Sequence, residues 1–157
     1  LAPGRPAHLR DAVGSSKSVL ASLLTDHVPG VLVITPAEEQ AAHFAADLQN
    51  LSTAGVLFFP PTRRKPYDAE QVNDASALVQ RSDILGQLAE GEPFIVCAPA
   101  EAVADKLISA EEFRRDTLTI EKGATLPLDE LRRQLVDQGY RGVTMVDEPG
   151  TFAVRGG

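Results

Sequence analysis

The sequence predicts an α/β fold, in which helices flank a mostly parallel sheet and the start of a smaller α+β domain follows. Three short apolar runs, at residues 31–34, 56–59 and 94–98, carry this prediction. Continuous apolar runs of this length are typical of strands buried in parallel sheets. Segments with the apolar spacing of helices lie between them. A strand, a helix and a strand in succession form a βαβ unit, so parallel pairing with right-handed crossovers is expected.

Length and composition limit the classes of function. The chain has 157 residues, 43% of them hydrophobic, which suffices for one core or for one domain with part of another. Its net charge of −7 argues against broad non-specific binding to nucleic acid. The single cysteine, Cys97, excludes an internal disulfide and a multi-cysteine zinc site, and it fits a cytoplasmic location. No apolar run is long enough to span a membrane and no signal peptide is visible, while a first residue other than Met suggests an excised piece.

Lys17 and Ser18 fit the end of a phosphate-binding loop, G-x-x-x-x-G-K-[ST], whose backbone N–H groups wrap the phosphates of a nucleotide. Asp11 and Ser16 stand at the two glycine positions, and Gly14 lies between them without restoring the pattern. An aspartate there brings negative charge close to the phosphates, and serine adopts the required backbone geometry less readily than glycine. The sequence therefore predicts a degenerate loop at Gly14, Lys17 and Ser18, with no nucleotide bound.

Capping residues and apolar spacing place the first helices. Ser15 or Ser16 is expected to cap a helix with apolar positions at Val19, Leu20, Leu23 and Leu24. Thr35-Pro36-Ala37-Glu38 is typical of a capping box, and the helix after it is expected to bury Ala41, Phe44, Ala45 and Leu48. A helix over 73–90 is expected to end at Gly91 and to carry one stripe of Leu78, Ser82, Leu85 and Leu88.

The chain after the third apolar run predicts a change of sheet. Pro99 is expected to open a short helix through Leu107, and Ser109 to Glu112 form a second capping box. Residues 117–121 alternate as a half-exposed strand does, unlike the earlier runs. A helix over 128–138 follows, closed by Gly139, with inward positions at Leu128, Leu131, Leu135 and Val136. The change of strand type predicts two domains, residues 1–114 and 115–157.

One dense basic cluster stands out between the second apolar run and the helix over 73–90. It consists of Arg63, Arg64 and Lys65. Three adjacent cations suit a phosphate or an acidic partner, and they equally suit a solvated loop.

The last residues predict a turn at Pro149-Gly150 and a strand over 151–155. On that strand Phe152 and Val154 share one face, while Arg155 lies on the other. From the pattern alone, this tail predicts a hairpin that carries a solvated arginine.

As a string, Gly139-Tyr140-Arg141 with residues 148–157 resembles the N-terminal module of the bacterial transcription-repair coupling factors (the Mfd family). That module is similar to UvrB of nucleotide excision repair, and both carry a Tyr-Arg segment, a turn and a Gly-x-Phe-x-Val-Arg-Gly strand. Pro66-Tyr67-Asp68 resembles a Leu-Pro-Tyr-Asp element of the same family. The resemblance implies a RecA-like first lobe without an intact phosphate loop, followed by the first part of an inserted domain that docks on UvrA.

The resemblance also implies which residues contact UvrA. Arg155 matches the final arginine of the family strand, and Phe152 lies on the same strand. Arg141 follows the matching tyrosine, although UvrB carries its arginine one residue later, where this chain has Gly142. Ala153 stands where UvrB has its other strand arginine, so that contact is not expected here.

For the whole protein the resemblance implies a DNA translocase whose ATP, Mg²⁺, DNA and RNA polymerase are bound by other domains. The segment itself is then a non-catalytic module that recruits UvrA. A second hypothesis is an ATP-binding helicase-type lobe of a UvrB-like protein, which requires an intact phosphate loop. A third is an unrelated α/β enzyme for a small molecule, which requires catalytic partners for His8, His27 or His43, and the sequence places none beside them.

Overall fold

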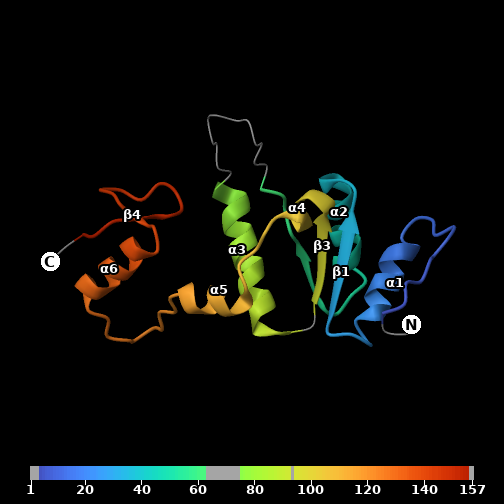
Figure 1. Ribbon diagram of the computed structural model, residues 1–157, viewed down its shortest axis with the longest axis horizontal. Coiled ribbons are helices and arrows are strands. Elements are labelled where there is room, and N and C mark those ends of the chain that lie inside the picture. Colours follow the sequence, from blue (N-terminus) through green and yellow to red (C-terminus); the bar gives the residue numbers. More distant parts are fainter. Residues whose placement is uncertain (1–3, 63–74, 93, 156–157) are drawn as a thin grey trace. The chain divides into compact units, whose positions relative to one another are not determined.

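A computed structural model describes residues 4–62, 75–92 and 94–155, and its elements group into two compact units. The first unit contains α1 (Ser16–Leu24), β1 (Gly30–Thr35), α2 (Glu38–Gln49), β2 (Gly55–Phe58), β3 (Phe94–Pro99) and α4 (Ala100–Ala104). The second contains α3 (Ala75–Glu90), α5 (Ala110–Asp116), α6 (Leu128–Asp137), β4 (Arg141–Gly142) and β5 (Thr151–Phe152). Figure 1 shows these elements along the chain. Helix α3 thus groups with later elements, and the predicted division at residue 115 stays a prediction.

The first unit is built on a parallel sheet that has three strands among the described residues, in the order β1-β3-β2. Both outer strands pair with β3, so that Cys97 lies between Val33 of β1 and Phe58 of β2. Of these three strands, β3 comes last in the sequence and lies at the centre of the sheet. A small parallel sheet flanked by helices confirms the predicted α/β class, and the RecA-like assignment stays a prediction.

Helices α1 and α2 cover one face of this sheet with a small apolar core. The core consists of Ala21, Ala45, Leu48, Ile95 and Cys97, with Val31, Val33, Phe44, Val56 and Phe58 packed against it. Leu48 and Cys97 are fully buried. Burial raises the pKa of the Cys97 thiol to about 11, so the thiol stays protonated at neutral pH and fills volume in the core, as the sequence predicts.

The three apolar runs are strands, but only β3 is buried along almost its whole length. In β1 burial alternates, and Leu32 and Ile34 are each 54% exposed. The prediction that this run is buried on both faces is therefore wrong. An apolar run reports that a strand can be covered twice, whereas the layers around it decide whether both of its faces are covered.

Two predicted helix caps are also wrong in detail. Thr35 ends β1 opposite Pro99, and its hydroxyl donates to the Ala37 carbonyl, so α2 begins at Glu38 without a side-chain cap. Ser15 is the N-cap residue of α1, yet its hydroxyl donates to the Asp47 carboxylate rather than capping the helix. In both cases another hydrogen bond takes the side chain that the sequence pattern assigns to the helix end, a local one for Thr35 and a tertiary one for Ser15.

The apolar stripes of two helices differ from those predicted. In α1 the buried residues are Ser18 and Ala21, while the predicted Val19, Leu20 and Leu23 are largely exposed. In α3 the buried positions are Ala77, Arg81 and Ile84 instead of Leu78 and Ser82. By contrast, α2 buries Ala41, Ala45 and Leu48 as predicted, with Phe44 half-buried.

Alanine substitutions at two glycines, one inside α3 and one directly after it, are expected to change the free energy of unfolding in opposite directions. Gly86 lies inside the helix, where a Cβ atom would meet Phe113 at 3.8 Å, an ordinary contact. Gly86→Ala is expected to stabilise the protein by about 0.5–1 kcal/mol, because alanine restricts the unfolded chain. Gly91 follows the helix at φ +83°, and Gly91→Ala is expected to cost about 1 kcal/mol, because a side chain there is strained. Urea unfolding measures both; equal signs would contradict the prediction.

The capping box at Ser109 is confirmed in both directions. The Ser109 hydroxyl accepts a hydrogen bond from the Glu112 backbone N–H, and the Glu112 carboxylate accepts one from the Ser109 backbone N–H at 2.9 Å. The Ser109 backbone and side-chain hydrogen bonds lower the pKa of Glu112. The preceding helix, α4, ends at Ala104 and not at the predicted Leu107.

The predicted strand over 117–121 is not formed, which is a correction to the sequence prediction. An alternating pattern becomes a strand only where another strand pairs with it, and no described strand pairs with these residues. Helix α6 follows and ends at Gly139 as predicted, at φ +87°. Leu131 and Leu135 are half-buried, whereas the predicted inward residues Leu128 and Val136 are more than half exposed.

Candidate partner-binding site

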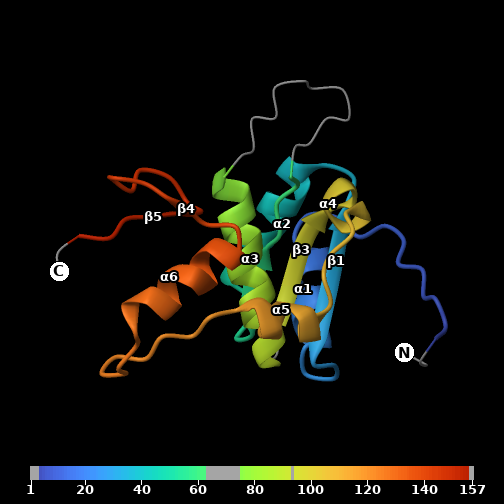
Figure 2. The ribbon, with the colours of Figure 1, turned by 60° about the vertical axis from the view of Figure 1, so that its left-hand side comes forward.

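The tail of the chain forms a two-stranded parallel pair, β4 with β5, and not the predicted hairpin (Figure 2). The Arg141 N–H donates to the Gly150 carbonyl at 2.9 Å, and the Val143 N–H donates to the Phe152 carbonyl at 2.8 Å. Gly150 adopts φ +79° in the predicted turn, and the segment between the strands brings the chain back to the start of β4. The strands run parallel because β5 enters beside the same end from which β4 began.

Arg141 lies at the start of β4 and forms an ion pair with Glu148 through its Nη2 atom. Both side chains are exposed, at 70% and 54%. The Thr151 hydroxyl donates to the Glu148 carbonyl at 2.7 Å, and Thr151 itself is buried. One of the predicted contact arginines is thus already engaged with a carboxylate of its own chain.

Phe152 lies next to β4, and its ring is half-buried against Gly142. A Cβ atom at position 142 would lie 3.6 Å from the Phe152 ring, an ordinary van der Waals contact, so Gly142 lies beside that ring. The structure therefore brings Phe152 and Arg141, two of the predicted contact residues, onto the same pair of strands.

Arg155 follows β5 and is exposed. The predicted strand through Arg155 is wrong, since β5 ends at Phe152 and Val154 is 47% exposed. Strand pairing stops there because β4 is only two residues long. Within the described parts of the chain, the Arg155 guanidinium forms no hydrogen bond or ion pair, which leaves all its donors available.

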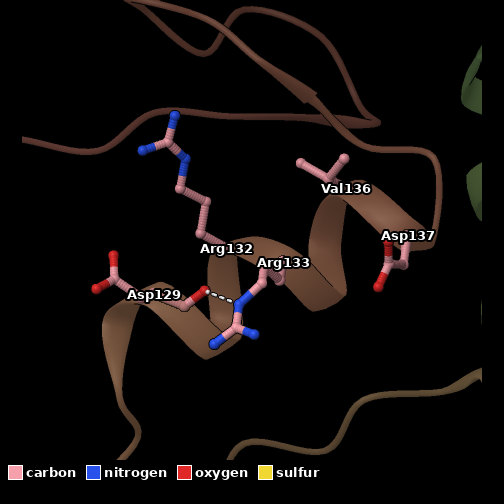
Figure 3. A pocket seen from close by; sticks show the side chains of 5 residues that line it. All are labelled: Asp129, Arg132, Arg133, Val136 and Asp137. Atoms are coloured by element: carbon pink, nitrogen blue, oxygen red, sulfur yellow. Dashed lines mark hydrogen bonds between the residues drawn. The ribbon is translucent and has the colours of Figure 1, made fainter.

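Sequence reasoning missed two further arginines in this segment, Arg132 and Arg133 of α6. With Asp129, Val136 and Asp137 they line an open hollow of about 400 Å³ (Figure 3). The Arg133 Nε–H donates to the Asp129 backbone carbonyl at 3.4 Å, as the dashed line in Figure 3 shows. The signal was available, since positions 129, 132, 133, 136 and 137 recur with the spacing of one helix face.

The degenerate phosphate loop borders a separate hollow of about 430 Å³ in the first unit. Gly14, Lys17 and Ser18 line it, together with Asp47 of α2. Ser18 is only 2% exposed, and its hydroxyl donates to the Asp47 carboxylate at 3.3 Å. Asp11, at the first glycine position, has φ 57°. In a phosphate-binding loop the hydroxyl at the position of Ser18 is directed to Mg²⁺, whereas here it is bonded to the Asp47 carboxylate. The absence of bound nucleotide stays a prediction.

The remaining candidates can be placed more briefly. Arg63, Arg64 and Lys65 lie outside the described residues, as does the Pro66-Tyr67-Asp68 element. His8, His27 and His43 are exposed, and His43 lies 3.8 Å from Glu39 one helical turn away. Among the described residues, no three His, Cys, Asp or Glu side chains gather as a metal site requires. Nor is any described helix long and apolar enough to cross a membrane.

Comparison with known proteins identifies the class of the tail first. The family model described as the UvrB interaction domain matches residues 118–157, which contain α6 and the β4–β5 pair. The chain is also similar to transcription-repair-coupling factors from Bacillus subtilis (30% identity over 92% of the chain) and Haemophilus influenzae (31% over 80%). The factor from Myxococcus xanthus shares 28% identity over 99% of the chain.

These similarities confirm the resemblance stated from the sequence: over most of its length the chain is similar to the transcription-repair-coupling factors. It spans 12%, 11% and 14% of the length of the three relatives. The matched domain begins at residue 118, beyond the predicted boundary near 115.

Proposed function

We propose that this chain is a non-catalytic module of a transcription-repair coupling factor, which recruits UvrA of nucleotide excision repair to a stalled RNA polymerase. The observation that carries the proposal is the match of residues 118–157 to the UvrB interaction domain. In this proposal the ATP-driven translocation on DNA and the contact with RNA polymerase belong to other parts of the longer relatives.

The chemistry of the β4–β5 pair supports a protein partner. Arginine and aromatic residues dominate the binding energy of protein interfaces, and Arg141, Phe152 and Arg155 bring both types together along a short stretch of chain. A guanidinium offers a planar fork of N–H donors that matches a carboxylate with two parallel hydrogen bonds. We therefore propose that acidic groups of UvrA bind the arginines of this tail.

The test is direct binding of UvrA to the purified chain, measured by calorimetry or by capture on immobilised chain. We expect saturable binding that weakens as salt is raised, because the proposed contacts are between charged groups at a surface. As a control, Arg10→Ala removes one exposed arginine outside the matched domain and should leave the affinity unchanged. If UvrA does not bind, the recruitment proposal is wrong.

A second prediction separates this function from the ATP-binding alternative. Mg²⁺–ATP added to the chain should give no binding heat, because Asp47 opposes phosphates at the degenerate loop. Lys17→Ala should leave both the nucleotide titration and the UvrA affinity unchanged. Measurable ATP affinity that disappears in Lys17→Ala would instead favour the helicase-type lobe.

A further inference from the structure

The ion pair between Arg141 and Glu148 contributes little to folding. Both side chains are more than half exposed, and ion pairs at such positions gain little free energy because water screens the attraction. The pair nevertheless joins one of the proposed UvrA contacts to a carboxylate of the same chain.

Backbone contacts hold the two partners of this pair near each other. The Arg141 N–H is bonded to the Gly150 carbonyl, and the Glu148 carbonyl accepts from the hydroxyl of the buried Thr151. These bonds are at 2.9 and 2.7 Å and do not involve the charged groups. The Glu148 carboxylate thus remains close to Arg141 even when the pair opens, which corresponds to a high effective concentration.

The occupied atom is the one that matters for carboxylate recognition. Glu148 contacts Nη2, which carries two N–H donors, one on the Nη1–Nη2 edge and one on the Nε–Nη2 edge. The contact therefore takes one of these donors and places a negative charge beside both edges. A second carboxylate on the same edge would also be repelled by the first. Arg155 has no such competitor among the described residues. The two arginines of the tail therefore differ: Arg141 is paired with a carboxylate of its own chain, and Arg155 is unpaired among the described residues.

We propose that Glu148 is an internal ligand of Arg141, which an incoming carboxylate of the partner must displace before Arg141 contributes to binding. This inference rests on the proposed function, since it describes how the same surface binds UvrA. Competition with Glu148 makes the surface selective. A single weakly bound carboxylate does not displace Glu148 from Arg141, whereas a partner that also binds Arg155 does.

The test compares UvrA affinity of the full chain with that of Glu148→Gln. The glutamine keeps the size of the side chain and removes its charge, so we expect the Kd to fall about two- to fivefold. In an Arg141→Ala background the same substitution should leave the Kd for UvrA unchanged, because the guanidinium that Glu148 binds is absent. Asp147→Asn is the matched control: it removes a neighbouring negative charge, and no described ion pair joins Asp147 to Arg141.

Weaker or unchanged binding by Glu148→Gln would overturn the inference, as would an equal gain from Asp147→Asn. A second readout does not depend on UvrA. The Arg141 side-chain N–H signal in NMR, titrated with an oligo-glutamate peptide, should shift at lower peptide concentration in Glu148→Gln than in the unaltered chain. Absence of UvrA binding refutes the recruitment proposal alone, whereas identical peptide titrations refute the internal-ligand proposal.

Discussion

Replacing Arg155 by alanine should weaken UvrA binding by about 30-fold or more, the effect of losing a central arginine of an interface. Arg155 is exposed and forms no hydrogen bond or ion pair with the described residues, so all the N–H donors of its guanidinium are available to the partner. The fold should be unaffected for the same reason. Circular dichroism and urea unfolding check the fold, and calorimetric titration with UvrA measures the affinity.

Two further variants sharpen this prediction. Arg155→Lys keeps the charge and loses the fork of donors, so it should recover only part of the affinity if a two-pronged contact is made. Arg132→Ala removes an exposed arginine of α6 within the same matched domain. A loss in Arg132→Ala as large as that in Arg155→Ala would move the centre of the interface to the hollow on α6.

Leu48→Ala is expected to destabilise the first unit by about 2–5 kcal/mol. Leu48 is fully buried where α2 packs on the sheet, and its core neighbours include Ile95 and Cys97 of the central strand. Truncation loses the transfer free energy of the side chain and leaves a cavity, since the surrounding strands are fixed by their pairing. The free energy of unfolding from urea titration measures the cost.

The matched control for this variant is Leu23→Ala. Leu23 lies on α1 with 56% of its surface exposed, so the same chemical change should cost less than about 1 kcal/mol. Comparable losses in the two variants would mean that the core is not centred on Leu48. Reactivity of Cys97 toward a thiol reagent offers a second readout, because its buried, protonated thiol should react only as the unit unfolds.

Local signals predicted those elements whose partners are close in sequence. The Ser109 capping box formed with both of its hydrogen bonds, and Gly91 and Gly139 ended their helices at positive φ. The signals failed where another hydrogen bond took the side chain or where no described strand pairs with the segment. The Thr35 hydroxyl bonds to the Ala37 carbonyl and the Ser15 hydroxyl to Asp47 instead of capping helices. Residues 117–121 have no neighbouring strand among the described residues.

The candidate site was predictable in composition and unpredictable in arrangement. The family-like string pointed to Arg141, Phe152 and Arg155, and the match of residues 118–157 to the UvrB interaction domain contains all three. Glu148 could not be singled out, because its pairing with Arg141 depends on the return path of the chain into a parallel strand.

By itself, the sequence determined the α/β class, the three sheet strands and the similarity to transcription-repair-coupling factors. Apolar runs, caps and short motifs encode these features within a few neighbouring residues. Only the tertiary structure decided that β3 lies between β1 and β2, that Asp47 accepts a hydrogen bond from the Ser18 hydroxyl, and that Glu148 forms an ion pair with Arg141. The first two depend on groups far apart in the chain, and the third depends on how the chain returns beside β4. In each case the packing of strands and helices, and not local preference, brings the groups together.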